Sequence, residues 1–299
     1  MAQSAFEVAT SPNGTAIPGA SAATDPQFNL NAYFAEQSSY WAQIYEREGI
    51  KEAIHQDRLR AALAMVDTLH LPPDARVLDV GCGTGIATVA LAARGLTVDA
   101  LDPCEAMVEA TRKRAVAAKA QSRITTRLGD VHAMPFADNT FSLVVALGVL
   151  PWLPELGKPL WEMARVIRPG GHMVVNVDSL WQLRQALDPL RTALLQHPKK
   201  WLRDALRRWF GQSGARSYPT SIRALRLALA AEGFEILQGV ALGFGPFTFF
   251  DREILPRSTG LKLHHRLQAL ANQGAPILRS TGSQYIVLAQ KRDGAMTGS

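Results

Sequence analysis

The segment Val77-Leu-Asp-Val-Gly-Cys-Gly-Thr-Gly85 decides the fold of this chain. The apolar residues 76–80 predict a short buried strand, and the Ala-rich residues 86–94 predict a helix directly after the glycines. Glycines in such a strand-to-helix turn let the backbone approach a ligand, and the first turn of the helix offers amide donors that lack partners. The segment therefore predicts a binding site for a nucleotide-like cofactor.

The spacing of the glycines distinguishes this segment from the dinucleotide fingerprint. That fingerprint reads G-x-G-x-x-G, whereas this chain has Gly81, Gly83 and Gly85, with Ile86 in place of the last glycine. The mismatch disfavours NAD. The second predicted strand ends at Asp102, where a carboxylate can accept hydrogen bonds from both hydroxyls of a ribose. Asp102 is therefore predicted to bind a ribose.

Strands and helices alternate along much of the chain. Strand, helix, strand, helix at this spacing indicates right-handed crossovers, so the chain is predicted to be an α/β protein with a parallel sheet. Residues 28–70 carry a helical pattern before the first strand. The predicted strands are 76–80, 96–101, 124–128, 141–147, 172–177, 234–242 and 284–290, and the later helices are 86–94, 105–120, 159–167 and 221–232.

Five motifs follow one another between residues 75 and 178. They are the glycine segment 77–85, Leu101-Asp-Pro-Cys-Glu-Ala-Met107, Gly129-Asp-Val-His-Ala-Met-Pro-Phe136, Phe141-Ser-Leu-Val-Val-Ala146 and Arg168-Pro-Gly-Gly171. Together they resemble the class I S-adenosylmethionine-dependent methyltransferases, in the small-molecule group that includes ubiquinone-biosynthesis-type enzymes. The resemblance implies a Rossmann-like, seven-stranded, mostly parallel sheet with helices on both faces, an antiparallel last strand and a helical cap. It also implies S-adenosylmethionine as cofactor and S-adenosylhomocysteine as product.

The same resemblance implies roles for individual residues. Asp79 would help to hold the ammonium group of the cofactor, directly or through water, and Asp102 would bind the ribose. Asp130 and the backbone of Val131 would read the adenine edge, and Met107 would either pack beside the adenine or belong to the plain core. The remaining residues expected around the cofactor are Gly81, Cys82, Gly83, Gly85, Pro103 and Leu147.

The sequence assigns no general base. Methyl transfer from a sulfonium mainly requires alignment of the nucleophile, methyl group and sulfur, and exclusion of water. Many relatives have a histidine after the fourth strand, where this chain has Gly148-Val-Leu-Pro-Trp152. His132, two residues after Asp130, is a weak catalytic candidate, and a position in the pocket wall or on the ordinary surface fits it equally well. Cys82 and Cys104 have no metal-ligand spacing and are expected to pack as small buried residues.

Two absent motifs favour a small-molecule acceptor. The tetrad Asn/Asp-Pro-Pro-Tyr of amino-methylating enzymes and the paired-glutamate loop of arginine methyltransferases are both missing. We therefore expect transfer to a small or lipid-like metabolite, first of all at oxygen, with nitrogen and carbon acceptors left open. The aromatic residues predicted to wall the acceptor pocket are Tyr40, Trp41, Tyr45, Trp152, Phe244 and Phe247.

The charge of the chain is local. Its 299 residues are 47% hydrophobic and 19% charged, which excludes whole-chain disorder and a coiled coil. Residues 184–226 carry ten Lys or Arg and two Asp, a balance of +8 against +6 for the whole chain. This stretch is predicted to form a basic amphipathic cap that faces a membrane surface, an amphiphilic substrate or only water. Nucleic acid is not the expected partner, because no recognised RNA-binding module accompanies these residues.

Six segments are predicted along the chain. They are a disordered tail (1–27), N-terminal helices forming a substrate lid (28–72), the cofactor-binding core (73–179), the basic cap (180–217), the C-terminal completion of the core (218–292) and a flexible tail (293–299). No signal peptide or membrane span is predicted, so a cytoplasmic location is expected, with peripheral contact at the inner membrane surface through the cap left open. RNA or peptide methylation, and a non-catalytic scaffold that binds S-adenosylmethionine, remain alternative functions.

Overall fold

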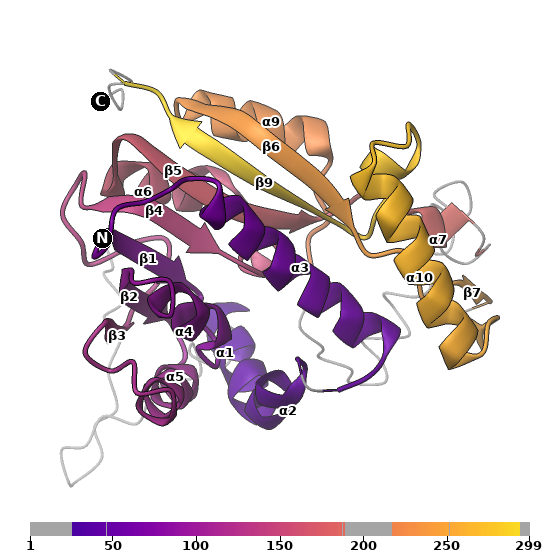
Figure 1. Cartoon of the computed structure of the whole chain (residues 1–299), viewed down its shortest axis with the longest axis horizontal. Coiled ribbons are helices and arrows are strands. Elements are labelled where there is room, and N and C mark those ends of the chain that lie inside the picture. The colour runs from indigo at the N-terminus through magenta and orange to yellow at the C-terminus, as the bar shows by residue number, and fades with distance from the viewer. Residues whose placement is uncertain (1–25, 46, 187, 189–216, 251, 294–299) are drawn as a thin grey trace, which may run out of the picture.

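The computed structural model describes residues 26–45, 47–186, 188, 217–250 and 252–293. A seven-stranded sheet runs through them (Figure 1). In spatial order its strands are β3 (Ile124–Leu128), β2 (Thr97–Asp102), β1 (Arg76–Val80), β4 (Phe141–Ala146), β5 (Ile167–Asp178), β9 (Gln284–Lys291) and β6 (Phe234–Leu242). Neighbours from β3 to β5 pair in parallel, and β9 is antiparallel to both β5 and β6. The predicted α/β fold with an antiparallel last strand is confirmed.

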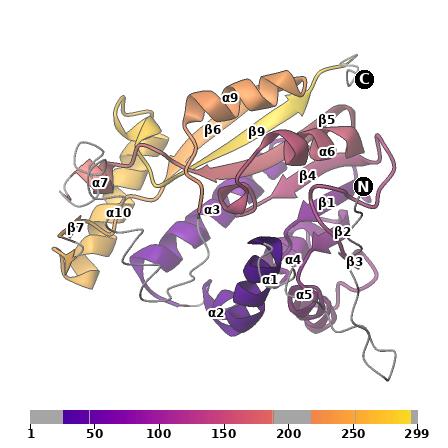
Figure 2. The same ribbon diagram turned by 180° about the vertical axis from the view of Figure 1, so that it is seen from behind.

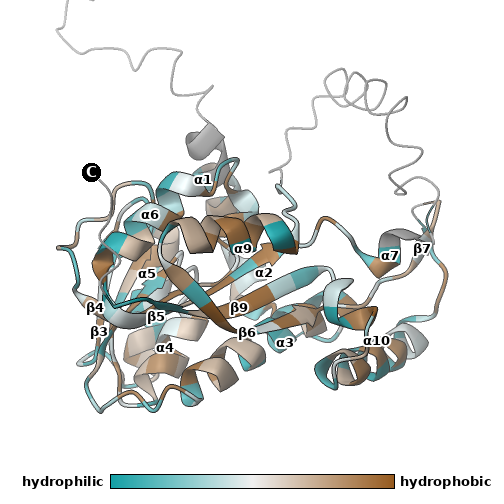
Figure 3. Cartoon of the chain, turned by 90° about the horizontal axis from the view of Figure 1, so that it is seen from above, coloured by the Kyte–Doolittle hydropathy of each residue, from teal (hydrophilic) through white to brown (hydrophobic). Residues whose placement is uncertain are grey.

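Helices cover both faces of the sheet (Figure 2). Seen from above, α3, α4 and α10 lie on one side of the sheet and α6 and α9 on the other (Figure 3). A small β7–β8 ribbon (Thr248–Phe249 and Arg252–Glu253) follows β6. The helices are α1 (Pro26–Glu36), α2 (Ser38–Gln43), α3 (Ile50–Asp67), α4 (Ile86–Ala92), α5 (Glu105–Ala117), α6 (Gly157–Val166), α7 (Leu183–Ala186), α9 (Ile222–Ala231) and α10 (Arg257–Asn272), with 3-10 turns at Leu150–Trp152 and Leu278–Ser280.

The hydrophobic core consists of two layers, one on each face of the sheet. Successive side chains of a strand point to opposite faces, so Val77 packs with α3 and α4, whereas its neighbour Leu78 packs with α6 and α9. Both side chains are fully buried. All six residues of β4 are buried as well, as expected for a parallel strand that is covered on both faces. The strand that leads into the glycine segment is therefore anchored in the middle of the core.

The structure differs from the sequence-based expectation in three places. The helical pattern over 28–70 is divided into α1, α2 and α3: α1 and α2 adjoin at Gln37, where helical hydrogen bonds continue, and α3 begins only at Ile50. The predicted turn 168–171 lies inside β5, where the pairing with β4 shifts register. Helix α10 was not predicted, and it packs against α3 and β6.

Much of the predicted cap and both predicted tails lie outside the described residues. The basic residues of this stretch that belong to α9, Arg223 and Arg226, are exposed, while Leu225 and Leu229 of the same helix are buried. In α9 the charge therefore forms the solvated face of a helix that packs on the sheet. Within the described ranges, every helix is too short or too polar to cross a membrane.

Candidate functional site

A cavity of about 430 Å³ lies at the carboxyl ends of the central strands. Val80 at the end of β1, Asp102 at the end of β2 and Leu147 after β4 form its floor, and the N-terminal helices line it from the other side. Strand order reverses between β1 and β4: β2 and β3 lie on one side of β1, whereas β4 and β5 lie on its other side. Ligands of open α/β sheets bind at such a reversal.

Two glycines of the turn after β1 have different tasks. Gly83 has φ +54, and a Cβ placed on it would meet no protein atom within 4 Å, so its backbone is open to a ligand. Gly85 has φ +78 and precedes α4, but a Cβ there would lie 2.9 Å from Cα of Thr111 on α5. Gly85 is outside the cavity lining, so its task is close packing of the turn on α5 and not ligand contact.

Asp102 ties the turn to the end of β2. Its Oδ2 accepts a hydrogen bond from the backbone N–H of Gly83 at 2.9 Å, and its Oδ1 accepts one from the backbone N–H of Cys104 at 2.9 Å. The residue is only 7% exposed, and burial raises the pKa of its carboxyl to about 6, although both hydrogen bonds act in the opposite direction. Its carboxylate is thus fixed at the cavity wall by two backbone donors.

Asp79 places a second carboxylate in the same wall. It is 1% exposed, and its Oδ2 accepts a hydrogen bond from Oγ1 of Thr88 at 2.6 Å. Burial raises the pKa of this carboxyl to about 7, and the nearby charge of Asp102 adds to the shift. Neither carboxylate forms an ion pair in the part of the chain that the structure describes. This end of the cavity therefore suits a ligand with a cationic group and hydroxyls.

The cavity brings together most of the residues that the sequence analysis singled out. Met107 is buried and also lines the cavity, which fits both an adenine contact and a place in the core. The predicted cofactor residues in the lining are Asp79, Gly81, Cys82, Gly83, Asp102, Pro103, Met107, Asp130, Val131 and Leu147, and the predicted acceptor residues in it are Tyr40, Trp41, Tyr45 and Trp152.

Three further candidates lie elsewhere. His132 is not in the lining, and its Nδ1 lies 2.6 Å from Oδ1 of Asp130, so it is a partner of that carboxylate at the rim. Phe244 and Phe247 are buried outside the cavity. The chain after β6 turns toward α10, where the backbone N–H of Phe244 donates to Nδ1 of His264 at 3.2 Å. Phe244 therefore lies against α10, whereas the backbone oxygen of Phe247 accepts from the backbone N–H of Ile254 beside the β7–β8 ribbon.

Sequence reasoning missed several lining residues. His55 and Arg58 reach the cavity from α3, Asp178 from the end of β5 and Gln284 from the start of β9. One signal was available, since Arg58 stands four residues after Ile54 and four before Ala62, on the apolar face of its helix. A charged residue on such a face is rarely buried without a task. Asn31, Tyr33 and Phe34 of α1 are further members of this set.

Methyltransferases are among the known proteins that are similar to this chain. A methyltransferase domain model matches residues 78–175. Methyltransferase GfsG of Streptomyces halstedii is 31% identical over 170 residues, which are 56% of this chain and 59% of that protein. The chain thus spans little more than half the length of this relative. Demethylmenaquinone methyltransferase of Mycolicibacterium gilvum is 31% identical over 181 residues, which are 56% of this chain and 75% of that protein.

A solved structure shows the same fold. Magnesium protoporphyrin IX methyltransferase (ChlM) from Synechocystis, solved with bound S-adenosylhomocysteine, superposes with a TM-score of 0.58. The superposition covers 89% of this chain and 100% of that chain, at 18% sequence identity. At this identity the likeness concerns the arrangement of the strands and helices.

Proposed function

Because this chain belongs to the class I S-adenosylmethionine-dependent methyltransferases, we propose that it transfers a methyl group from S-adenosylmethionine to a small-molecule acceptor. The observation that carries this proposal is the pair of buried carboxylates, Asp79 and Asp102, beside the open backbone of Gly83 in one cavity. A metabolite acceptor is supported by the relatives, since Mycolicibacterium gilvum uses a demethylmenaquinone methyltransferase that matches this chain.

The residues at the β1–β2 end of the cavity fit the cofactor. Asp79 is placed to balance its ammonium group, because a buried carboxylate without a cationic partner favours a cationic ligand. Asp102 is placed to accept from the ribose hydroxyls, and Gly83 leaves room for the methionine chain. Met107, Asp130 and the other lining residues of this end would enclose the adenine. We infer these contacts from the two buried carboxylates, which accept hydrogen bonds, and from the open backbone of the turn.

The reaction needs little beyond orientation and exclusion of water. When bound, S-adenosylmethionine supplies a methyl group on a positively charged sulfur that leaves as a neutral thioether. The aromatic side chains of the N-terminal helices cover the cavity: the rings of Phe34 and Trp152 are 5.4 Å apart, and those of Tyr33 and Trp152 are 6.3 Å apart. They would keep water away from the reacting atoms and hold a flat acceptor in line with the methyl group.

An oxygen acceptor would also lose a proton. His55 lines the cavity, but burial and the neighbouring charge of Arg58 lower the pKa of its ring to about 3, so it is a weak base. Asp178 also lines the cavity and is the better base, because burial raises the pKa of its carboxyl, although the charges of Arg58 and Arg184 act in the opposite direction. We infer that Asp178 takes up the proton of an acceptor hydroxyl.

The proposed activity is tested by transfer of a labelled methyl group. The protein would be incubated with methyl-labelled S-adenosylmethionine and a small-molecule extract, and the labelled product would be identified by mass spectrometry. We expect label in a metabolite, and none with Asp102→Ala. Label in added RNA or peptide alone would contradict a small-molecule acceptor. Binding of the cofactor without any labelled product from extracts of several sources would favour a non-catalytic scaffold.

The affinity for S-adenosylhomocysteine is expected to fall with acidification. In the free chain, burial raises the pKa of Asp79 to about 7 and that of Asp102 to about 6, and the ligand's ammonium and hydroxyls favour the ionised carboxylates. When the pH lies below these pKa values, binding must remove a proton from the carboxyl concerned. The affinity should therefore fall about tenfold per pH unit below pH 7 and more steeply below pH 6. Calorimetry between pH 5.5 and 8.5 would measure this slope. A flat profile would contradict the role of Asp79, and Asp79→Asn should remove the slope between pH 6 and 7.

A further inference from the structure

The buried polar atoms that lack a hydrogen-bond partner gather at one end of the cavity. Among the described residues, such side-chain atoms belong to six residues, and four of these residues line the cavity. The other two, Asn176 and Ser179, lie in or next to the end of β5, beside the lining residue Asp178. The four atoms of lining residues are Nε1 of Trp41, Nδ1 of His55, Nε of Arg58 and Oε1 of Gln284.

This concentration points to a polar ligand. Buried polar groups in folded proteins nearly always have a partner, because an unpaired group forfeits its bonds to water without replacement. Here donors and an acceptor from α2, α3 and β9 lie around the same cavity. They come from segments far apart in the sequence, so their meeting is a product of the fold. A ligand in this part of the cavity would supply their partners.

Arg58 is the strongest member of this set. It is 7% exposed, and it forms neither an ion pair nor a hydrogen bond with any residue inside the described ranges. Its guanidinium lies beside the turn after β4, where a Cβ placed on Gly148 would lie 3.0 Å from Nη1 of Arg58. Asp178 acts on this cation electrostatically but makes no hydrogen bond with it, and a buried cation that lacks ion pairs and hydrogen bonds is costly. The site therefore favours a ligand that brings negative charge.

The cavity differs in charge between its two sides, since one side carries two carboxyls and the other carries Arg58 with the carboxyl of Asp178. Asp79 and Asp102 stand on β1 and β2, whereas Arg58 lies beside Gly148, which follows β4, and acts electrostatically on Asp178 at the end of β5. Because β4 and β5 lie beyond β1 in the sheet, the arginine side is distinct from the carboxylate side. The arginine side suits the anionic part of an acceptor, and the carboxylate side suits the cofactor.

We propose that Arg58 binds an anionic oxygen group of the methyl acceptor, a carboxylate or an ionised hydroxyl, and that the acceptor carries this group on a flat aromatic or conjugated body. The aromatic wall supports the second part, since the ring of Trp41 lies 5.5 Å from that of His55 and 6.0 Å from that of Phe34. This inference rests on the proposed methyltransferase function and names the chemical class of its acceptor.

The test titrates 2-naphthoate, and its neutral isostere 2-naphthamide, into the protein saturated with S-adenosylhomocysteine. Tryptophan fluorescence reports binding, because Trp41 and Trp152 line the cavity. We expect the wild type to prefer naphthoate by about tenfold or more, as a charge-assisted hydrogen bond in a buried site provides. Arg58→Gln should abolish this preference and Arg58→Lys should keep part of it.

Arg60→Gln is the matched control. Arg60 is on the same helix, but its side chain is 68% exposed and pairs with Asp57, so this variant should bind both probes as the wild type does. Equal affinity of the wild type for naphthoate and naphthamide would overturn the inference while leaving the methyltransferase function intact. Failure of the wild type to bind S-adenosylhomocysteine would overturn both.

A second titration separates the two sources of a carboxylate. If Arg58 instead held the methionine carboxylate of the cofactor, Arg58→Gln would weaken S-adenosylhomocysteine binding and leave 5′-methylthioadenosine, which lacks the amino-acid part, unaffected. That result would overturn the inference. We expect the affinity of Arg58→Gln for S-adenosylhomocysteine to stay within about threefold of the wild type, since a lost charged hydrogen bond would change it by tenfold or more.

Discussion

Asp102→Asn should weaken the binding of S-adenosylhomocysteine by about 100-fold or more. The carboxylate holds two backbone donors, those of Gly83 and Cys104, at 2.9 Å each, and is placed to accept from the ribose. An asparagine has one acceptor oxygen, so its NH₂ group would face a backbone N–H and the turn would lose its tie to β2. Losing the charge that would assist two hydrogen bonds from the ribose corresponds to roughly 3–5 kcal/mol, or about two to four orders of magnitude in affinity.

The measurement is calorimetry at pH 8, where the Asp102 carboxyl, with its pKa raised to about 6 by burial, is ionised. Asp99→Asn is the matched control, because Asp99 is a buried carboxylate of the same strand that pairs with Arg76 at 2.8 Å and Arg127 at 3.4 Å, outside the cavity. This variant should lower the stability and leave the affinity unchanged. If Asp102→Asn bound within threefold of the wild type, the ribose would have to lie elsewhere.

The parts of the site that the sequence predicted are those encoded locally. The strand Val77–Val80, the glycines after it and the aspartate at the end of β2 follow one another in a short stretch, and each is positioned by the strand that precedes it. Apolar strands buried on both faces are visible in a sequence, and parallel strands end at the same edge of the sheet. The carboxylate side of the cavity therefore follows from the order of the strands.

The arginine side depends on packing between distant segments. The position of Arg58 on the apolar face of its helix indicates burial, but which strand ends it faces is decided only by how α3 packs on the sheet. Gln284 begins a strand and does not end one, but β9 is antiparallel, so its first residue lies at the edge where the parallel strands finish. The expected antiparallel strand contained this information. Phe244 and Phe247 were misplaced for the opposite reason, since β6 is the outermost strand and the chain beyond it packs on α10.

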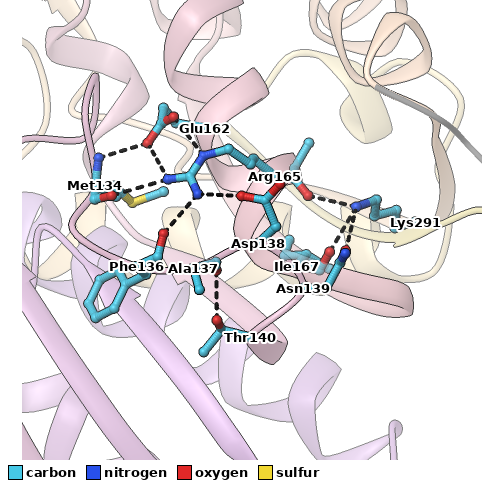
Figure 4. Close-up of polar contacts among 11 residues, drawn as sticks. Met134, Phe136, Ala137, Asp138, Asn139, Thr140, Glu162, Arg165, Ile167 and Lys291 are labelled. Carbon is cyan, nitrogen blue, oxygen red and sulfur yellow. Dashed lines mark hydrogen bonds and ion pairs between the residues drawn. The ribbon is translucent and has the colours of Figure 1, made fainter. Parts of the chain in front are cut away.

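Glu162→Ala should lower the free energy of unfolding by about 3 kcal/mol or more. Glu162 is buried on α6, and its Oε2 accepts from the backbone N–H of Met134 at 2.7 Å, in the segment that follows β3. Arg165 donates to both of its oxygens at 2.9 Å (Figure 4). Alanine would leave a buried backbone donor and a largely buried guanidinium without this carboxylate, and breaking a buried pair from one side costs roughly 3–5 kcal/mol. Denaturant unfolding monitored by circular dichroism measures the change.

Asp138→Ala tests whether burial makes the ion pair between Glu162 and Arg165 strong. Asp138 accepts from the same guanidinium at 2.7 Å, but its side chain is 66% exposed, against 7% for Glu162. Water replaces an exposed carboxylate, so this variant should lose less than about 1 kcal/mol. Arg165 also donates to the backbone carbonyl oxygens of Met134 and Phe136, bonds that both variants retain. Similar losses in the two variants would mean that Glu162 acts only as a surface partner of Arg165. A large loss in Glu162→Ala alone would show that its buried bonds hold the segment carrying Asp130 and Val131 against α6.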